Sequence, residues 1–347
     1  MKLSYTEIVL VIIIAALLLI GIDSKTKREG NIGQEILFLQ QHIKRIDSKG
    51  EEIVVVFSSG PVYSNNDEEL YFRDKLLFRN IERELKERGY STVFINTPCL
   101  SNGERCLEDF SRLALGISDL GPKAVIYKGI DSGIGSQAFS TIINKNNIPM
   151  YTIGTEVSID TKGYVGPDNI KLGKEAYEGL RPLLKPGQTA VYVETVRLSN
   201  GDKLENGYPR INSARNYLTD AGIIEKKTLF TNWSKTQTYG EVLDLLDKQG
   251  PVDYIITPST ETAEGAVAAV TTAGYRGQIT IVALDLTQRI VELIIEGDLY
   301  GGVPQQFLRQ AEVIADMVDN NNDRGDKRLF AGKLVRKENL VDIDNLW

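Results

Sequence analysis

The sequence contains little of what enzymes and metal proteins use most. Its 347 residues include one histidine, His42, and two cysteines, Cys99 and Cys106. A single histidine cannot build a histidine-rich metal site, and no serine–histidine or cysteine–histidine pair is expected. We therefore expect a protein that is not an enzyme and that holds neither a cofactor nor a metal ion.

An excess of positive charge is also lacking. The 47 acidic residues outnumber the 40 lysines and arginines, which gives a formal net charge of -7. A nucleic-acid-binding protein needs a basic face that neutralises phosphates, so no nucleic acid is expected as a partner. The apolar content of 42% and the charged content of 25% are those of a globular protein. The length fits two lobes of roughly 100 to 200 residues each.

Only one long stretch is strongly apolar, and it lies near the amino terminus. The uncharged run from Ile8 to Ile22 would span about 22 Å as a helix, which is less than the ~30 Å hydrocarbon core of a bilayer. It fits a signal-peptide core as well as a tight membrane anchor. No A-x-A-like cleavage pattern follows it. This favours a membrane anchor or uncleaved signal at residues 1–25, with a single membrane pass.

A short amphipathic segment follows the apolar run. Its apolar residues recur at the spacing of a heptad seam, at Ile32, Ile36, Leu39, Ile43 and Ile46. This spacing predicts a membrane-proximal helix within residues 26–50. The helix either packs on its own domain or forms a stalk through which two copies make a homodimer.

The rest of the chain alternates between predicted strands and helices. Ile53–Phe57 is a continuous apolar run, which is typical of a strand buried on both faces. A stretch with helical periodicity follows and stops at Gly89. About ten such units are too many for one compact sheet. We therefore expect an α/β fold with two doubly wound parallel-sheet lobes.

The two cysteines lie close together in the stretch PCLSNGERC. The residues between Cys99 and Cys106 are enough to close a small loop. In an exported domain, a disulfide between them is as consistent with the sequence as two free thiols. Such a bond would tie down one surface loop.

Three stretches of the body carry a family resemblance. They are YKGIDSGIGSQAFSTIINKNNIPMYTIG, GYVGPDNIKLGKEA and the long segment that runs from VDYIITPSTETAEG to GDLYGGVPQQ. In this order they resemble the ribose-binding-protein family of type I periplasmic sugar-binding proteins, over about Glu51 to Leu334. The resemblance implies a three-strand hinge between two lobes. It places residues 51–166 and 305–335 in the N-terminal lobe, 167–304 in the C-terminal lobe and 336–347 in a tail.

The resemblance also implies ligand-binding residues in the second lobe. Asp285 matches the family's hydroxyl-binding aspartate, although it could instead cap the next helix. Gln305 matches the family's hinge glutamine. Arg210 is either a ligand-binding arginine or a solvated residue at a helix start. Trp233 would stack on a sugar ring, and Ser259 stands where the family often has asparagine.

The first lobe departs from the family pattern. Thr155 and Glu156 stand where the family carries an Asp-Arg pair, and the loop after the first strand is longer than usual. Phe72 could belong to the core instead of the pocket, and Arg73 to the surface. These departures favour a sugar other than ribose. We expect first-lobe contacts with the ligand from Thr155 and Glu156, and from Ser59, Tyr71, Phe72 or Arg73.

The layout is most similar to anchored xylose-type binding proteins that act with a sensor histidine kinase. This implies an extracytoplasmic domain that senses a monosaccharide, with a pentose such as xylose favoured, by closing its lobes. The alternative is the substrate-binding subunit of an ABC sugar importer, whose partner is an ABC permease. Related sugar repressors share the core, but they need a DNA-binding segment where this chain has its apolar run.

Overall fold

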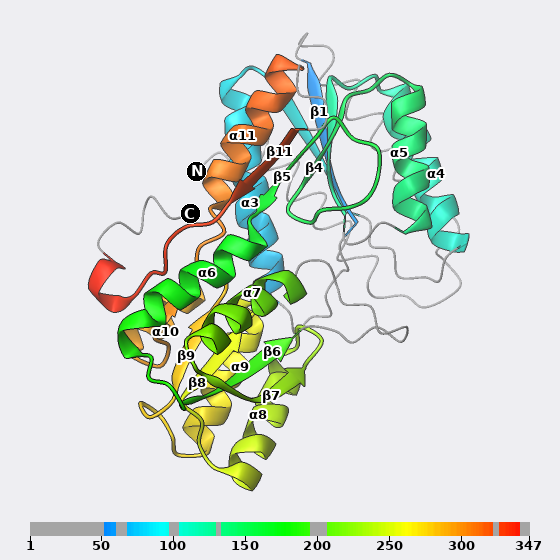
Figure 1. Ribbon diagram of the computed structural model, residues 1–347. Coiled ribbons are helices and arrows are strands. Elements are labelled where there is room, and N and C mark those ends of the chain that lie inside the picture. Colours follow the sequence, from blue (N-terminus) through cyan, green and yellow to red (C-terminus); the bar gives the residue numbers. More distant parts are fainter. Residues whose placement is uncertain are drawn as a thin grey trace, which may run out of the picture.

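Two parallel β-sheets, one in each lobe, organise the chain (Figure 1). The computed structural model describes residues 52–59, 68–96, 104–129, 133–194, 207–321 and 326–340. Every pairing between strands in these two sheets is parallel. The expected α/β fold with two parallel-sheet lobes is confirmed.

The N-terminal lobe holds a six-stranded sheet in the order β11-β5-β4-β3-β1-β2. Helices α3 and α11 pack together on one face of this sheet, and α4 and α5 pack together on the other. The elements are β1 (Ile53–Ser58), α3 (Glu68–Glu87), β2 (Ser91–Asn96), α4 (Glu104–Asp119), β3 (Ala124–Lys128), α5 (Ile134–Lys145), β4 (Met150–Ile153), β5 (Gly163–Pro167), α11 (Phe307–Asn320) and β11 (Asp326–Phe330).

The C-terminal lobe holds a five-stranded sheet in the order β10-β9-β8-β6-β7. Helices α6 and α7 cover one face, and α8, α9 and α10 cover the other. The elements are α6 (Asn169–Leu180), the short 3-10 helix η2 (Arg181–Leu183), β6 (Thr189–Glu194), α7 (Gly207–Asp220), β7 (Ile224–Phe230), α8 (Lys235–Gln249), β8 (Tyr254–Thr257), α9 (Thr260–Thr272), β9 (Thr280–Ala283), α10 (Gln288–Glu296) and β10 (Gly301–Gly302).

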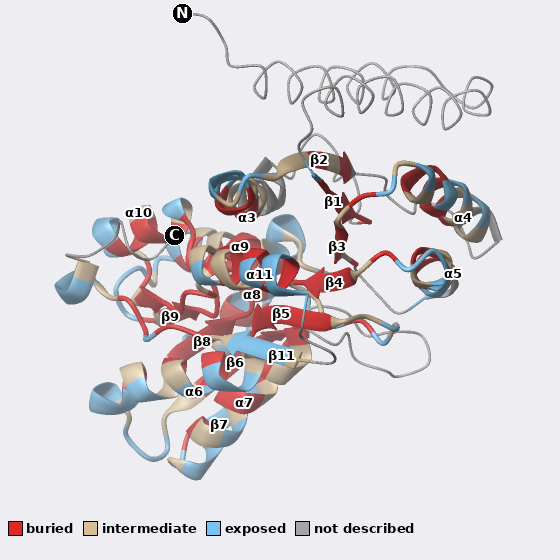
Figure 2. Cartoon of the chain, turned by 90° about the horizontal axis from the view of Figure 1, so that it is seen from above, coloured by how far each residue is buried: buried red, intermediate tan, exposed pale blue. Residues whose placement is uncertain are grey.

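Side chains that alternate along the central strands build a separate core on each face. In β1, Val55 and Phe57 pack with α4 and α5, whereas Val54 and Val56 pack with α3 and α11. All residues of β1 are buried, because helices cover both faces of a parallel sheet. Figure 2 shows these central strands as buried elements between helices whose outer faces are exposed.

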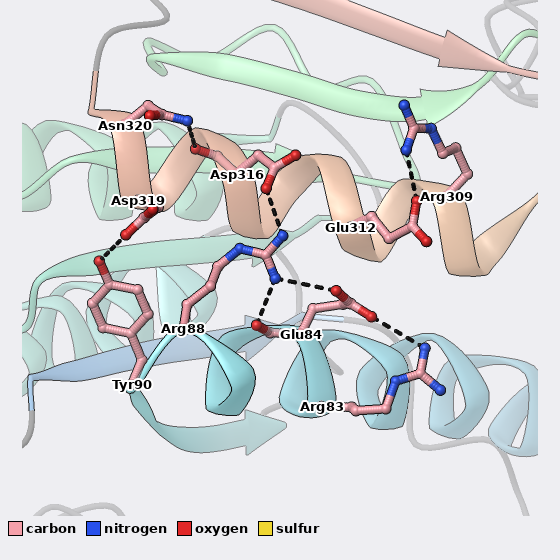
Figure 3. A network of polar contacts seen from close by, with 9 residues as sticks. All are labelled: Arg83, Glu84, Arg88, Tyr90, Arg309, Glu312, Asp316, Asp319 and Asn320. Carbon is pink, nitrogen blue, oxygen red and sulfur yellow. Dashed lines mark hydrogen bonds and ion pairs between the residues drawn. The ribbon is translucent and has the colours of Figure 1, made fainter.

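A polar network on the outside of the first lobe joins α3 to α11 (Figure 3). Arg88 donates from Nη2 to Oδ1 of Asp316 at 2.5 Å and from Nη1 to the carbonyl oxygen of Glu84 at 2.7 Å. Tyr90 donates from its hydroxyl to Oδ1 of Asp319 at 2.8 Å. These bonds fix a helix from the end of the chain against a helix from its first half.

The chain crosses between the lobes three times. The crossings follow β5, β10 and β11, and each leaves its sheet at the carboxyl end of a strand. All strands within a sheet are parallel, so the carboxyl ends of both sheets face the opposite lobe. In open α/β sheets, ligands bind at this edge.

Backbone hydrogen bonds connect the crossings to one another. The N–H of Asp168 donates to the carbonyl oxygen of Phe330 at 2.8 Å, and the N–H of Gly332 donates to that of Pro304 at 2.9 Å. A Cβ atom at Gly332 would lie 2.4 Å from the ring of Pro304, so the close approach requires glycine. The three crossings therefore form one connected hinge.

Residues 331–335 pack on the C-terminal lobe, which corrects their expected place in the N-terminal lobe. Ala331 and Leu334 lie in the core beneath α6 and α7, and Val335 pairs with Gly302 through two backbone hydrogen bonds. Leu334 fits there because the glycine at position 179 leaves space for its side chain. The third crossing therefore begins directly after Phe330.

Several predictions concern residues outside the described ranges. They include the membrane helix, the membrane-proximal helix and the proposed bond between Cys99 and Cys106. The fold therefore leaves these expectations untested. In the ranges that the structure describes, no helix has both the length and the apolar character needed to cross a bilayer.

Candidate ligand-binding site

Polar side chains gather at the hinge edge of the C-terminal lobe. Asp285 follows β9, Ser259 follows β8 and Gln305 lies on the second crossing. All three are almost inaccessible, with Asp285 1% exposed and Gln305 6% exposed. A buried polar group needs hydrogen-bond partners, and these partners define the geometry of the site.

The Asp285 carboxylate is the centre of this cluster. Its Oδ1 atom accepts from Nε2 of Gln305 at 2.9 Å and from the N–H of Leu286 at 3.0 Å. Its Oδ2 atom lies 3.4 Å from the hydroxyl donor of Thr260. Donors from the hinge and from the start of α9 therefore orient the carboxylate. A carboxylate held in this way accepts strong hydrogen bonds from hydroxyl groups.

The helix after β9 is capped by a different residue. The side chain of Thr287 accepts from the N–H of Ile290, and Thr287 is the N-cap of α10. The alternative that Asp285 caps this helix is therefore wrong. Thr287 also shares a hydrogen bond of 3.0 Å with Thr260, which links the first turns of α9 and α10.

Arg210 is a buried linking residue and does not lie solvated at a helix start. It is 3% exposed, although it stands in the first turn of α7. Its Nε atom donates to Oδ1 of Asn169 at 2.9 Å, and Nη1 donates to the carbonyl oxygens of Pro258 at 3.0 Å and Leu284 at 3.2 Å. The guanidinium thus joins the first crossing to the ends of β8 and β9, next to Asp285.

Ser259 has a structural task in the described fold. It is 0% exposed and forms a capping box with Thr262, in which each side chain accepts from the other residue's backbone N–H. This arrangement satisfies backbone donors at the start of α9. The hydroxyl of Ser259 is therefore engaged in holding the loop that also presents Thr260 to Asp285.

Trp233 follows β7 and is half-buried. Its φ of 59° and the φ of 50° at Asn232 place two consecutive residues in the left-handed region. This region is uncommon for residues other than glycine. Strained backbone of this kind is often found at ligand-binding positions. In the sheet, β8 and β6 stand between β7 and the strand that precedes Asp285.

In the first lobe, Ser59 contributes to a buried hydroxyl network. It is 1% exposed and follows β1. Its Oγ atom lies 2.9 Å from the hydroxyl of Tyr127, which lies 2.7 Å from Oγ of Ser136. These groups stand at the carboxyl ends of β1 and β3 and at the start of α5. The network faces the same hinge edge as the cluster in the other lobe.

The other first-lobe candidates are spread out. Thr155 is half-buried and follows β4, whereas Glu156 is exposed and accepts from Nζ of Lys327 at 2.6 Å on the edge strand β11. The structure therefore does not bring Glu156 together with Asp285. Phe72 and Arg73 lie in α3, but their side chains, like those of Tyr71, are outside the described part.

Tyr164, on the strand before the first crossing, is affected by charges from both lobes. Burial raises the pKa of Tyr164 far above its usual range, the negative charge of Glu156 raises it further, and the positive charge of Arg210 opposes both. The hydroxyl of Tyr164 donates to the carbonyl oxygen of Gly154 at 3.0 Å. A neutral, hydrogen-bonded tyrosine therefore stands on β5, immediately before the hinge.

Reasoning from the sequence missed three side chains of this site. Asn169 accepts from Arg210, Thr260 donates to Asp285, and Thr287 shares a hydrogen bond with Thr260. Their signals were weak, because a polar residue before a helical pattern is ordinarily a cap. In the described ranges, no group of three or more histidine, cysteine, aspartate or glutamate residues could hold a metal ion.

A separate groove of about 350 Å³ lies on the flank of the C-terminal lobe, between α6 and α7. The hydroxyl of Ser213 donates to the carbonyl oxygen of Ile170, and the ring of Tyr217 stacks on that of Tyr177. These groups pack the two helices together. The lining residues are Ile170, Asn212, Ser213, Asn216, Tyr217 and Asp220.

Two parallel-sheet lobes, three connected crossings and a polar cluster at the hinge edge define a two-lobed solute-binding protein. The chain belongs to the family described as the periplasmic binding protein domain, whose model matches residues 62–325. Its structural neighbours are type I periplasmic sugar-binding proteins.

Curated relatives are distant in sequence. A D-ribose/D-allose-binding protein of Pseudomonas aeruginosa is 25% identical over 189 residues, which is 54% of this chain and 55% of the relative. The fructose import binding protein FruE of Bifidobacterium longum is 24% identical over 162 residues, 44% of this chain and 47% of the relative. The chain thus spans about half the length of the curated relatives it matches.

Solved structures extend the similarity over most of the chain. An ABC transporter periplasmic solute binding protein from Actinobacillus succinogenes with bound D-allose has a TM-score of 0.69 and 17% identity, covering 83% of this chain and 99% of that one. An ABC transporter solute binding protein from Bacillus halodurans with bound myo-inositol has a TM-score of 0.67 and 16% identity, covering 86% and 98%. A chain from a XylFII-LytSN complex has a TM-score of 0.65 and 17% identity, covering 83% and 99%. At these identities the likeness shows a shared fold.

Proposed function

We propose that this chain binds a neutral monosaccharide between its lobes and reports the binding by lobe closure. The observation that carries the proposal is the bond between Gln305 and Asp285. It places a hydroxyl-binding carboxylate on one lobe and an amide on the hinge within one cluster. A sugar that contacts both would favour the closed arrangement, because ligands shift a conformational equilibrium toward the state they touch more.

We further propose that the protein is a membrane-anchored sensor with its binding domain on the extracytoplasmic side. The apolar run from Ile8 to Ile22 supports the anchor, and the heptad spacing after it supports a stalk. The fold of a chain from the XylFII-LytSN complex supports a sensor histidine kinase as the partner and a pentose such as xylose as the sugar.

A sugar screen tests the binding proposal. The full chain in detergent would be heated with D-xylose, D-ribose, D-allose, D-fructose, D-glucose or myo-inositol, and its melting temperature would be followed. A sugar at 100 times its dissociation constant should add roughly 2.7 kcal/mol to the free energy of unfolding. If none of the six raises the melting temperature, the proposal fails.

The alternative function is the substrate-binding subunit of an ABC sugar importer. Curated and structural relatives named for import or for ABC transporters favour it. The state of the amino terminus separates the two functions, because a sensor needs its anchor. Intact-mass measurement of the protein from its native membrane should find residues 1–24 retained, and their loss would favour the importer.

A further inference from the structure

Gln310 is not among the candidate sugar-binding residues, but its side chain contacts the hinge. It lies in the first turns of α11, in the N-terminal lobe, and is 0% exposed. Its Nε2 atom donates to the backbone carbonyl oxygen of Gln305 at 2.7 Å. A buried amide that donates to a crossing between lobes restrains the path of that crossing.

This bond continues into the ligand cluster. Gln310 donates to the main chain of Gln305, and the side-chain amide of Gln305 donates to Oδ1 of Asp285 at 2.9 Å. Oδ2 of Asp285 accepts from the hydroxyl of Thr260. All four side chains are at least 94% buried. One unbroken set of hydrogen bonds therefore runs from α11 in the first lobe to α9 in the second.

The backbone between these residues needs such restraint. Gln306 has φ 59° and ψ 55°, a left-handed conformation that persists only where the surroundings enforce it. Gln310 holds the carbonyl immediately before this residue. On the other side, the N–H of Gly332 holds the carbonyl oxygen of Pro304. The peptide that carries the Gln305 side chain is thus fixed from both directions.

We infer that Gln310 is a positioning residue for sugar binding. It fixes the main chain of Gln305, so that the side-chain amide of Gln305 reaches Asp285 at the angle a sugar requires. Gln310 moves with the first lobe and Asp285 with the second, so this set of bonds also couples lobe position to the carboxylate. The inference rests on the proposed function, in which Asp285 binds the sugar.

The test compares Gln310→Met with Gln188→Met. Methionine fills a similar volume but removes the donor. Gln188 is a matched control, because its side chain accepts from the N–H of Lys185 at 2.7 Å and from the hydroxyl of Tyr254 at 2.8 Å, at the opposite end of β6 from the hinge. Gln310→Leu, which also lacks a donor and is close in volume, serves as a second variant.

The first measurement needs no sugar. Hydrogen–deuterium exchange of the full chain should show the peptide that covers residues 301–307 exchanging about fivefold faster in both Gln310 variants, as expected for the loss of one hydrogen bond. The same peptide should be unchanged in Gln188→Met. Equal exchange in wild type and Gln310→Met would show that the hydrogen bond from Gln310 to Gln305 does not restrain the hinge.

The second measurement titrates the same six compounds as the screen, D-xylose, D-ribose, D-allose, D-fructose, D-glucose and myo-inositol, by calorimetry. For any of them that binds the wild type, the dissociation constant should rise at least about fivefold in Gln310→Met and stay unchanged in Gln188→Met. Faster hinge exchange with unchanged affinity would overturn the positioning role. If none of the six binds the wild type, the proposed function fails, and the exchange measurement still decides whether Gln310 restrains the hinge.

Discussion

At the scale of single residues, the site depends on buried polar groups whose bonds are already arranged. Asp285 receives donors from Gln305 and from the main chain, and Arg210 holds the carbonyl oxygen of Leu284 beside it. Charged groups are costly to bury unless they are paired and hydrogen-bonded. These hydrogen bonds therefore offset the cost of burying both charges at the hinge edge, where the proposed sugar would bind.

Replacing Asp285 with asparagine should weaken sugar binding at least tenfold. Asparagine keeps the shape but removes the charge, and a hydrogen bond to a charged group contributes about 1.5–3 kcal/mol. Calorimetric titration with the sugar that the screen identifies measures the change. Asp298→Asn, which breaks a surface ion pair with Arg276, is the control and should bind normally. Unchanged affinity in D285N would show that the Asp285 carboxylate does not bind the sugar.

At the scale of elements, helix pairs determine where the site residues stand. Helices α6 and α7 approach closely at Gly173, where a Cβ atom would lie 2.4 Å from the carbonyl oxygen of Arg210 and 2.5 Å from the N atom of Ala214. Both atoms belong to the backbone, which cannot move aside as a flexible side chain can. The close contact places Arg210 within reach of Asn169.

Gly173→Ala should therefore destabilise the protein by about 1–3 kcal/mol, the usual cost of overpacking. Gly240→Ala is a matched control, since Gly240 lies in α8 with nothing within 4 Å of an added Cβ. There alanine should stabilise by roughly 0.5–1 kcal/mol, because glycine is a poor helix former. Urea denaturation of both variants measures these changes. Equal effects at the two positions would contradict the close packing.

The hydrogen bond from Tyr90, which follows α3, to Asp319 in α11 predicts that the free energy of unfolding depends on pH. Burial, with the hydrogen bond to Asp319, raises the pKa of Tyr90 to about 12, whereas an unfolded tyrosine titrates near 10. The folded state keeps this proton longer, so the contribution of Tyr90 is complete below pH ~10 and declines as the pH rises towards ~12.

Tyr90→Phe is the variant that isolates this contribution. The difference in the free energy of unfolding between wild type and Tyr90→Phe should shrink from pH ~10 to ~12, because the other tyrosines titrate alike in both proteins. Chemical denaturation across this range measures it. A difference that stays constant would show that the contact with Asp319 does not shift the titration of Tyr90.

At the scale of the whole molecule, the three crossings act as one hinge. Bonds from Asp168 to Phe330 and from Gly332 to Pro304 keep them together, and residues 331–335 pack on the second lobe. In the part of the chain that the structure describes, α3 of the first lobe also approaches α9 of the second. Hinges of this kind absorb rotation in a few residues at the ends of elements.

Saturation with the sugar found in the screen should make the protein more compact. The sugar contacts both lobes only when they are closed, so binding moves the population towards the closed form. Small-angle scattering of the full chain should show a smaller radius of gyration with sugar than without it, and no change for Asp285→Asn. An unchanged radius in the wild type at saturation would argue against lobe closure.

The sequence by itself determined the two-lobed α/β fold and most of its elements. Strands such as β1 are buried on both faces, so their composition is apolar throughout, and α3 ends at Glu87, close to the stop predicted at Gly89. The exposed edge strand β11, with its charged residues, and the two-residue β10 carry no such pattern. The family resemblance marked Asp285 and Gln305 as candidates.

Only the tertiary structure decided which side chains meet. It assigned Ser259 to a helix cap and Glu156 to the edge of the sheet, and it moved residues 331–335 to the second lobe. It also joined Gln310 to the hinge and Arg210 to Asn169. These contacts link segments far apart in the chain, and which distant segments meet depends on how the lobes pack. Local periodicity and composition record burial, but they do not record the identity of the neighbour.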